Sequence, residues 1–234
     1  LGAVAGTIRV EGVETLYGIG VGDTVILGTS VSGMVVDLRA GILDKLTLAA
    51  GGNTLTVSGV ETITGGTGAD IVTLGAATPG GSIRVDLGAG SDVLNLGEFA
   101  NTLKVAGIEV LNGGSFADNV TIDGAASGVT VDLNGGVDRL TLSASGSNSV
   151  TVRHVEFVTG LTGNDTITFD DTVSGVTVNL GAGTDKVILS AFDDAITVTG
   201  GVETLDGGLG IDTVTLQGNN NITLANVAGN DVRS

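Results

Sequence analysis

The sequence lacks several features that would place it in a familiar class of protein. It has no cysteine, which excludes disulfides and thiolate metal sites. It has one proline beside 41 glycines, and the glycines follow no three-residue period, which excludes a collagen helix. No apolar run is long enough to span a membrane, so we expect no transmembrane segment. Valine, isoleucine, leucine and threonine are plentiful, which together with the glycines favours a folded, mostly β protein with tight turns.

Basic residues and histidine are also scarce. Nine Lys and Arg stand against 26 Asp and Glu, and the formal net charge is −17. This charge disfavours nucleic acid and anionic membranes as partners and favours metal cations or basic protein surfaces. His154 is the only histidine, and no nucleophile motif accompanies it. We therefore expect no enzyme, with a β-helical polysaccharide-modifying enzyme as the less favoured alternative.

Internal repetition is what the sequence has in abundance. A glutamate recurs every 47 or 48 residues, an aspartate follows it nine residues later, and a second series of turn aspartates lies between these pairs. We predict one domain, 1–234, belonging to a longer chain, with repeats at about 6–52, 53–100, 101–147, 148–194 and 195–234. The glutamates, expected on a solvated corner, are Glu14, Glu61, Glu109, Glu156 and Glu203; the aspartates are Asp23, Asp70, Asp118, Asp165 and Asp212, then Asp44, Asp92, Asp138 and Asp185.

Apolar residues alternate with polar ones after every turn aspartate, at its second and fourth following positions, as in Val72 and Leu74. Two further strand series alternate in the same way in each repeat. Such short strands cannot each bury a face alone, whereas stacked coils make one continuous core. We predict an all-β, right-handed parallel β-solenoid of about ten coils of 20–27 residues. A two-sheet sandwich and a coil of 47 residues are the alternatives.

The turns carry a family resemblance. Gly65-Gly66-Thr67-Gly68-Ala69-Asp70-Ile71-Val72-Thr73 and the segment from Gly207 to Thr215 follow Gly-Gly-x-Gly-x-Asp-x-U-x, where U is a large apolar residue. This pattern resembles the hemolysin-type calcium-binding (RTX) repeats. The resemblance implies that Asp carboxylates and glycine carbonyls of neighbouring coils share Ca²⁺. The implied ligands are Asp70, Asp92, Asp165, Asp185, Asp212, Gly66, Gly68, Gly88, Gly90, Gly163, Gly181, Gly183, Gly208 and Gly210, with weaker sites at Asp23, Asp44, Asp118 and Asp138.

The same resemblance implies a biological setting. Proteins with such repeats are secreted by bacteria or displayed on their surface, as adhesins or surface-layer proteins. We therefore expect a non-enzymatic, calcium-stabilised structural module, extracellular or on the cell surface, with self-association into a lattice as a further expectation. The chain departs from the family because its turns are 20–27 residues apart, whereas the family's repeats follow every nine residues.

Two alternatives concern the side chains themselves. A turn aspartate can accept hydrogen bonds from backbone N–H groups and bind no metal. However, carboxylates stacked in one column about 5 Å apart repel each other by about 1 kcal/mol in water, which favours cations between the coils. Outward threonines could instead form a column that binds ice or glycan; these are Thr47, Thr73, Thr121, Thr141, Thr168 and Thr215.

Overall fold

The structure is a computed structural model that describes residues 6–18, 22–39, 41–76, 82–218, 221–226 and 231–233. These residues form 25 β-strands and no helix, so no helix in this part of the chain could cross a membrane. The chain divides into two compact units, Leu1–Val120 and Thr121–Ser234, which are described separately here. The architecture is all-β, as predicted.

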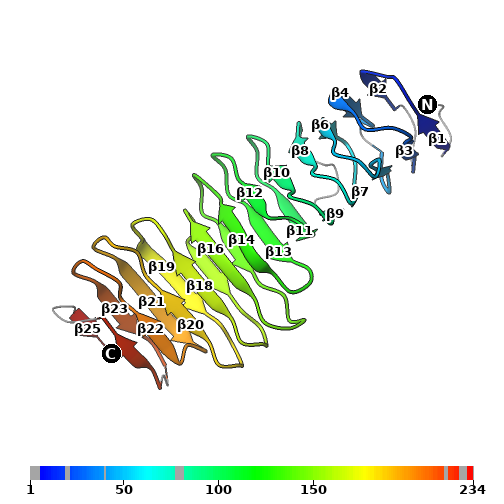
Figure 1. Ribbon diagram of the computed structural model, residues 1–234. Coiled ribbons are helices and arrows are strands. Elements are labelled where there is room, and N and C mark those ends of the chain that lie inside the picture. Colours follow the sequence, from blue (N-terminus) through cyan, green and yellow to red (C-terminus); the bar gives the residue numbers. More distant parts are fainter. Residues whose placement is uncertain are drawn as a thin grey trace. The chain divides into compact units, whose positions relative to one another are not determined.

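Two parallel sheets build each unit, and the chain alternates between them strand by strand (Figure 1). The odd-numbered strands are β1 Thr7–Val10, β3 Thr24–Leu27, β5 Lys45–Thr47, β7 Thr62–Gly66, β9 Ile83–Gly88, β11 Thr102–Ala106, β13 Asn119–Ile122, β15 Arg139–Thr141, β17 Phe157–Thr159, β19 Ser174–Asn179, β21 Ala195–Gly200, β23 Thr213–Leu216 and β25 Asp231–Arg233. The even-numbered strands are β2 Thr15–Tyr17, β4 Ser32–Asp37, β6 Thr54–Ser58, β8 Ile71–Leu74, β10 Val93–Asn95, β12 Val110–Asn112, β14 Ser127–Asp132, β16 Ser149–Arg153, β18 Thr166–Phe169, β20 Lys186–Ile188, β22 Thr204–Asp206 and β24 Thr223–Ala225.

One strand of each sheet makes one coil of a parallel β-solenoid, which confirms the predicted fold. At two strands per coil, the 25 described strands make twelve and a half coils, compared with the ten or so expected. Equivalent residues of successive coils are 17 to 22 positions apart, as between Asn53 and Asp70 (17) and between Asp70 and Asp92 (22). Coils of 17 or 18 residues are therefore shorter than the predicted 20–27, whereas coils of 20 to 22 residues fall within that range. The alternative coil of 47 residues is wrong. The right-handed sense stays a prediction.

The core lies between the two sheets and consists of the alternating residues recognised in the sequence. Val25, Leu46, Val72 and the other residues two places after each turn aspartate are all buried. The residues four places after it are also buried, except Leu216, which is half-buried. Each fully buried aliphatic side chain contributes roughly 1.5–3 kcal/mol. The stacked apolar columns therefore hold each sheet against the other along its unit.

Each 47-residue sequence repeat spans five strands. The repeating glutamates directly precede β2, β7, β12, β17 and β22. Because five is odd and the sheets alternate, each repeat begins in the sheet opposite to that of the preceding repeat. One repeat is thus two and a half coils rather than the two coils expected. Both sheets consequently carry the same five kinds of strand.

The strand that follows each glutamate was missed by the sequence reasoning. It has three residues in β2, β12, β17 and β22. Only its central residue points into the core, as Leu111 does in β12 and Val158 does in β17, both at most 1% exposed. A single apolar residue cannot display an alternation. The sequence therefore predicted two coils where two and a half were present.

Candidate functional site

The residue directly before each strand turns the chain from one sheet to the other. We call the corners that lead into even-numbered strands even corners, and those that lead into odd-numbered strands odd corners. In both units the polar side chains at these corners are joined from coil to coil. An oxygen of each side chain accepts a hydrogen bond from the backbone N–H of the corner residue in the preceding coil. We call such a series a corner ladder.

In the first unit the even-corner ladder contains four polar residues. The N–H of Asn53 donates to Asp70 Oδ1 at 2.8 Å. The N–H of Asp70 donates to Asp92 Oδ1 at 2.7 Å, and the N–H of Asp92 donates to Glu109 Oε2 at 2.6 Å. The ladder begins at Val31, whose N–H donates to Asn53 Oδ1 at 3.3 Å. The order along the stack is therefore apolar residue, Asn, Asp, Asp and Glu.

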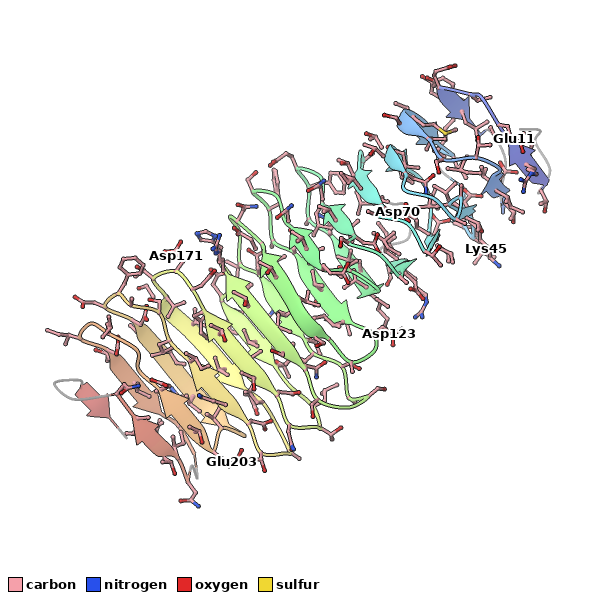
Figure 2. The ribbon with its side chains drawn as sticks, viewed as in Figure 1. Glu11, Lys45, Asp70, Asp123, Asp171 and Glu203 are labelled. Carbon is pink, nitrogen blue, oxygen red and sulfur yellow. The ribbon has the colours of Figure 1, made fainter. Side chains whose placement is uncertain are left out.

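The second unit repeats this order on its even corners. The N–H of Asn148 donates to Asp165 Oδ1 at 3.0 Å, that of Asp165 to Asp185 Oδ1 at 2.7 Å, and that of Asp185 to Glu203 Oε2 at 2.6 Å. Figure 2 labels Asp70 and Glu203, which belong to the first and second of these two ladders. The agreement between the units shows that the corner ladder is a property of the repeat.

The odd corners carry the same series, displaced by two and a half coils. Asp23 donates its N–H to Asp44 Oδ1 at 2.5 Å, and Asp44 donates to Glu61 Oε2 at 2.7 Å. In the second unit the N–H of Asp138 donates to Glu156 Oε2 at 2.7 Å, and that of Asp194 donates to Asp212 Oδ1 at 3.0 Å. Each kind of turn thus occurs on both corners.

The structure brings some of the predicted aspartates together and separates others. Three pairs lie in successive coils of one corner: Asp70 with Asp92, Asp165 with Asp185, and Asp23 with Asp44. The nine predicted aspartates do not form one column, because they divide between two corners. In the second unit the neighbour of Asp212 is Asp194, and that of Asp138 is Glu156.

Sequence reasoning missed the asparagines and misplaced the glutamates. Asn53, Asn101 and Asn148 recur at the repeat spacing, and their amides are buried within the ladders. The glutamates were expected on a solvated face: Glu14 and Glu109 are exposed, whereas the other three are half-buried. Four of the five nevertheless accept a hydrogen bond from the N–H of a buried aspartate. Their 47-residue period was visible in the sequence. The direction of the glutamate side chains was not visible, because it depends on which corner residue lies in the preceding coil.

The ladder aspartates are buried with half of their hydrogen-bonding capacity unused. Asp70, Asp92, Asp165 and Asp185 are at most 1% exposed, and the Oδ2 atom of each is buried without a partner. Burial raises the pKa of Asp92 above its ordinary value, the N–H of Asp70 lowers it, and the carboxylates of Asp70 and Glu109 raise it. A buried, unpaired carboxylate oxygen is unfavourable unless a proton or a cation meets it.

The same causes act on the other ladders. Burial raises the pKa of Asp185, and the carboxylates of Asp165 and Glu203 add to this shift. On the odd corner, burial raises the pKa of Asp44 and of Glu61, and each has a carboxylate neighbour that raises it further. Three stacked carboxylates at the Asp-Asp-Glu end of each ladder therefore form the most strongly charged part of a corner.

Glycines allow the backbones of neighbouring coils to approach each other closely at the corners. At all nine predicted glycine positions a Cβ would lie less than 3.0 Å from the backbone of a neighbouring coil. A Cβ on Gly90 would be 2.6 Å from Gly68 O and 2.8 Å from Asp92 Oδ1. A Cβ on Gly183 would likewise meet the carbonyl oxygen of Gly163 and Oδ1 of Asp185. A backbone oxygen and a carboxylate oxygen thus converge beside the same glycine in both units.

The donor chemistry of these corners fits Ca²⁺, which takes six to eight oxygen ligands from carboxylates, carbonyls and water. The fit rests on the buried, unpartnered Oδ2 atoms and on the backbone carbonyls that the glycines allow to come close to a carboxylate. No group of three or more acidic or histidine side chains in the described ranges is arranged to hold a metal by itself. A calcium ion at a corner would therefore need backbone carbonyls of the glycine turns to complete its shell.

The outward threonines do not form one column. Thr47, Thr121, Thr141 and Thr215 belong to odd-numbered strands, whereas Thr73 and Thr168 belong to even-numbered strands. The threonine column considered as an alternative for ice or glycan binding is therefore divided between two sheets.

His154 lies in a corner after β16, with φ 47° and its Nδ1 2.8 Å from Asp132 Oδ1.

No protein-family model matches the chain, and neither a curated protein nor a solved structure matches it. The corner ladders therefore have to be interpreted from their own geometry and chemistry.

Proposed function

We propose that this chain is a non-enzymatic structural module, a β-solenoid whose corners bind calcium between successive coils. The observation that carries the proposal is the set of buried aspartates whose Oδ2 atoms have no partner. In Asp70 and Asp92 the Oδ1 atoms accept backbone hydrogen bonds, so each ladder is already held together without metal. The Oδ2 atom of each of these aspartates is left without a hydrogen-bond donor or a counter-charge.

Calcium fits this role better than hydrogen bonding alone. Neighbouring coils are roughly 4.8 Å apart, so the carboxylates of one Asp-Asp-Glu series repel each other along the corner. A divalent cation between two coils would convert that repulsion into cross-linking of the stack. Because the ion would bind the coiled state and not the unfolded chain, it would raise the stability of the module.

The setting of the module follows from the resemblance of its turns to hemolysin-type repeats. The proposal is accordingly a segment of a secreted or cell-surface bacterial protein of the adhesin or surface-layer type. The net charge of −17 supports this, because repulsion among so many like charges weakens the coiled state where calcium is scarce, and bound calcium offsets that repulsion. Self-association into a lattice stays a prediction of the sequence.

Thermal unfolding in calcium and in EDTA tests the proposal. At calcium one hundred times above its Kd, one site stabilises the fold by about 2.7 kcal/mol, and several sites add to this. We expect a rise in Tm well above that produced by magnesium or by matched ionic strength from sodium chloride. A Tm that is equal in calcium and EDTA would refute the calcium part and leave a purely hydrogen-bonded ladder.

One observation favours a second candidate, a surface-binding module. The four neighbouring strands β6, β8, β10 and β12 contain no charged residue, in a chain with 26 acidic residues. Their outward columns carry Thr, Val, Ile and Asn, and Asn112 Nδ2 donates to Asn95 Oδ1 at 2.8 Å along one of them. An uncharged, ordered face of this kind suits ice or an insoluble neutral glycan. Loss of such binding in a Val93→Lys variant, with unchanged Tm, would support this candidate.

A further inference from the structure

A β-bulge recurs in β4, β14 and β19, at the same place in three repeats. At each bulge a glycine with a left-handed φ follows a serine, and nothing lies within 4 Å of the place where its Cβ would be. Bulges re-aim the neighbouring side chains and open the sheet edge. The register shifts lie at Ser32/Met34, Ser127/Val129 and Ser174/Val176, and the glycines are Gly33 (φ 71°), Gly128 (φ 72°) and Gly175 (φ 78°).

Surface pockets of matching composition lie beside two of these bulges, one in each unit. Their volumes are about 180 Å³ beside β4 and about 200 Å³ beside β19. Each pocket is bounded by a repeat glutamate, the valine before it, a valine at the next corner and the serine of the bulge. These residues are Glu14, Val13, Val31 and Ser32 in the first pocket, and Glu156, Val155, Val173 and Ser174 in the second.

The pockets lie where the corner ladder is interrupted. The corner residue that follows each glutamate in the stack is Val31 or Val173, which has no oxygen to continue the ladder. Because this valine has no side-chain oxygen, the ladder ends at the glutamate and the pocket has an apolar wall there. Glu156 Oε2 accepts a hydrogen bond from the N–H of Asp138. The other oxygen of this carboxylate, Oε1, is not buried without a partner as the Oδ2 atoms of the ladder aspartates are. The second oxygen is thus available to a ligand.

Size and chemistry limit what these pockets can take. Pockets for drug-sized ligands measure about 300–1,000 Å³, so each of these accepts only a group of side-chain size. One carboxylate, one or more hydroxyls and apolar walls fit a cation with an alkyl stem. His154 lines the second pocket, but no Phe, Tyr or Trp lines either one, which disfavours a sugar ring held by stacking. A single carboxylate is also too few for calcium without further ligands.

We propose that each of the two pockets binds a primary ammonium group on an alkyl stem, as in the side chain of lysine. The ammonium pairs with Glu14 or Glu156 and donates to the Ser32 or Ser174 hydroxyl, while the stem packs on the two valines. The net charge of −17 favours approach of such a basic group from solution.

NMR titration of the full chain, labelled with ¹⁵N and held at one calcium concentration, tests this proposal. The probe is Nα-acetyl-lysine N-methylamide, and its neutral counterpart is the norleucine analogue. We expect saturable shifts of the Ser32 and Ser174 amides with the lysine probe and binding about threefold weaker with the norleucine analogue. Butane-1,4-diamine provides a second arm: binding as tight as that of the lysine probe would assign the pockets to free amines.

Matched variants locate the binding. Glu14→Gln and Glu156→Gln remove the charge, and Glu156→Gln keeps an acceptor for the N–H of Asp138, so each should weaken lysine binding at its own pocket about threefold. Glu98→Gln, an exposed glutamate outside both pockets, serves as the control and should change neither site. Shifts spread over all acidic residues, equal binding of the norleucine analogue, or equal loss in the control would overturn the proposal.

Discussion

Replacement of Asp92 by asparagine separates the two roles of the corner carboxylates. Asparagine keeps an Oδ1 acceptor for the N–H of Asp70, which Asp92 Oδ1 accepts at 2.7 Å. It replaces the buried, unpartnered Oδ2 by an amide nitrogen and removes one negative charge. The variant therefore preserves the ladder and abolishes only the charge between Asp70 and Glu109.

The expected magnitude follows from the spacing of the coils. At roughly 4.8 Å, two unit charges repel by about 1 kcal/mol in bulk water and by about 3 kcal/mol at an effective dielectric of 20. Without calcium, Asp92→Asn should therefore stabilise the protein by roughly 1–3 kcal/mol. For a chain of this length each kcal/mol raises Tm by about 2–4 °C.

The assay is thermal unfolding followed by circular dichroism, in EDTA and in saturating calcium. We expect a higher Tm than wild type in EDTA and a smaller gain from calcium, because one of the ligand oxygens is lost. Asp92→Ala is the control: it removes the same charge but leaves the buried N–H of Asp70 without an acceptor, so in EDTA it should be about 1–3 kcal/mol less stable than Asp92→Asn. A lower Tm of Asp92→Asn in EDTA would refute the electrostatic reasoning, and an unchanged calcium gain would refute the metal.

Three further predictions concern pH, corner packing and the core. In EDTA, Tm should be higher at pH 5 than at pH 7, because burial raises the pKa of Asp44, Glu61, Asp92 and Asp185 in the folded state. Their protonation contributes stability that is fully present below the ordinary pKa values of 3.8 for Asp and 4.5 for Glu. That stability is lost as the pH rises through the raised pKa values of the folded state. A flat or opposite pH profile of Tm would contradict this. Gly90→Ala should cost about 1–3 kcal/mol in chemical denaturation, since its Cβ would be 2.6 Å from Gly68 O, and a neutral result would contradict the close stacking. Leu94→Ala should cost about 2–5 kcal/mol, because Leu94 is fully buried, whereas Val93→Ala on the outer face should cost about 1 kcal/mol or less.

The fold could be predicted because burial and period-two alternation coincide. Val72, Leu74 and their equivalents are apolar in the sequence and buried in the structure, so parallel stacking followed from their repetition. The coil length could not be obtained in the same way. The strand after each glutamate has one buried residue, such as Leu111, and offers no alternation to recognise.

The candidate site was predicted in its residue types but not in its arrangement. The turn aspartates were identified from their glycines, and they are buried at corners. Which of them are neighbours depends on the two-and-a-half-coil repeat, which places Asp70 beside Asp92 but Asp212 beside Asp194. The hydrogen bonds of the glutamates could not be predicted for the same reason, because only the register shows that Glu109 reaches back to Asp92.

A crystal structure of the chain grown in calcium tests the central claim most directly. The account predicts an ion beside Oδ2 of Asp92 and of Asp185, completed by glycine carbonyls of the adjoining coil. Well-ordered corners without metal density, with the same Oδ2 atoms facing only protein, would contradict it.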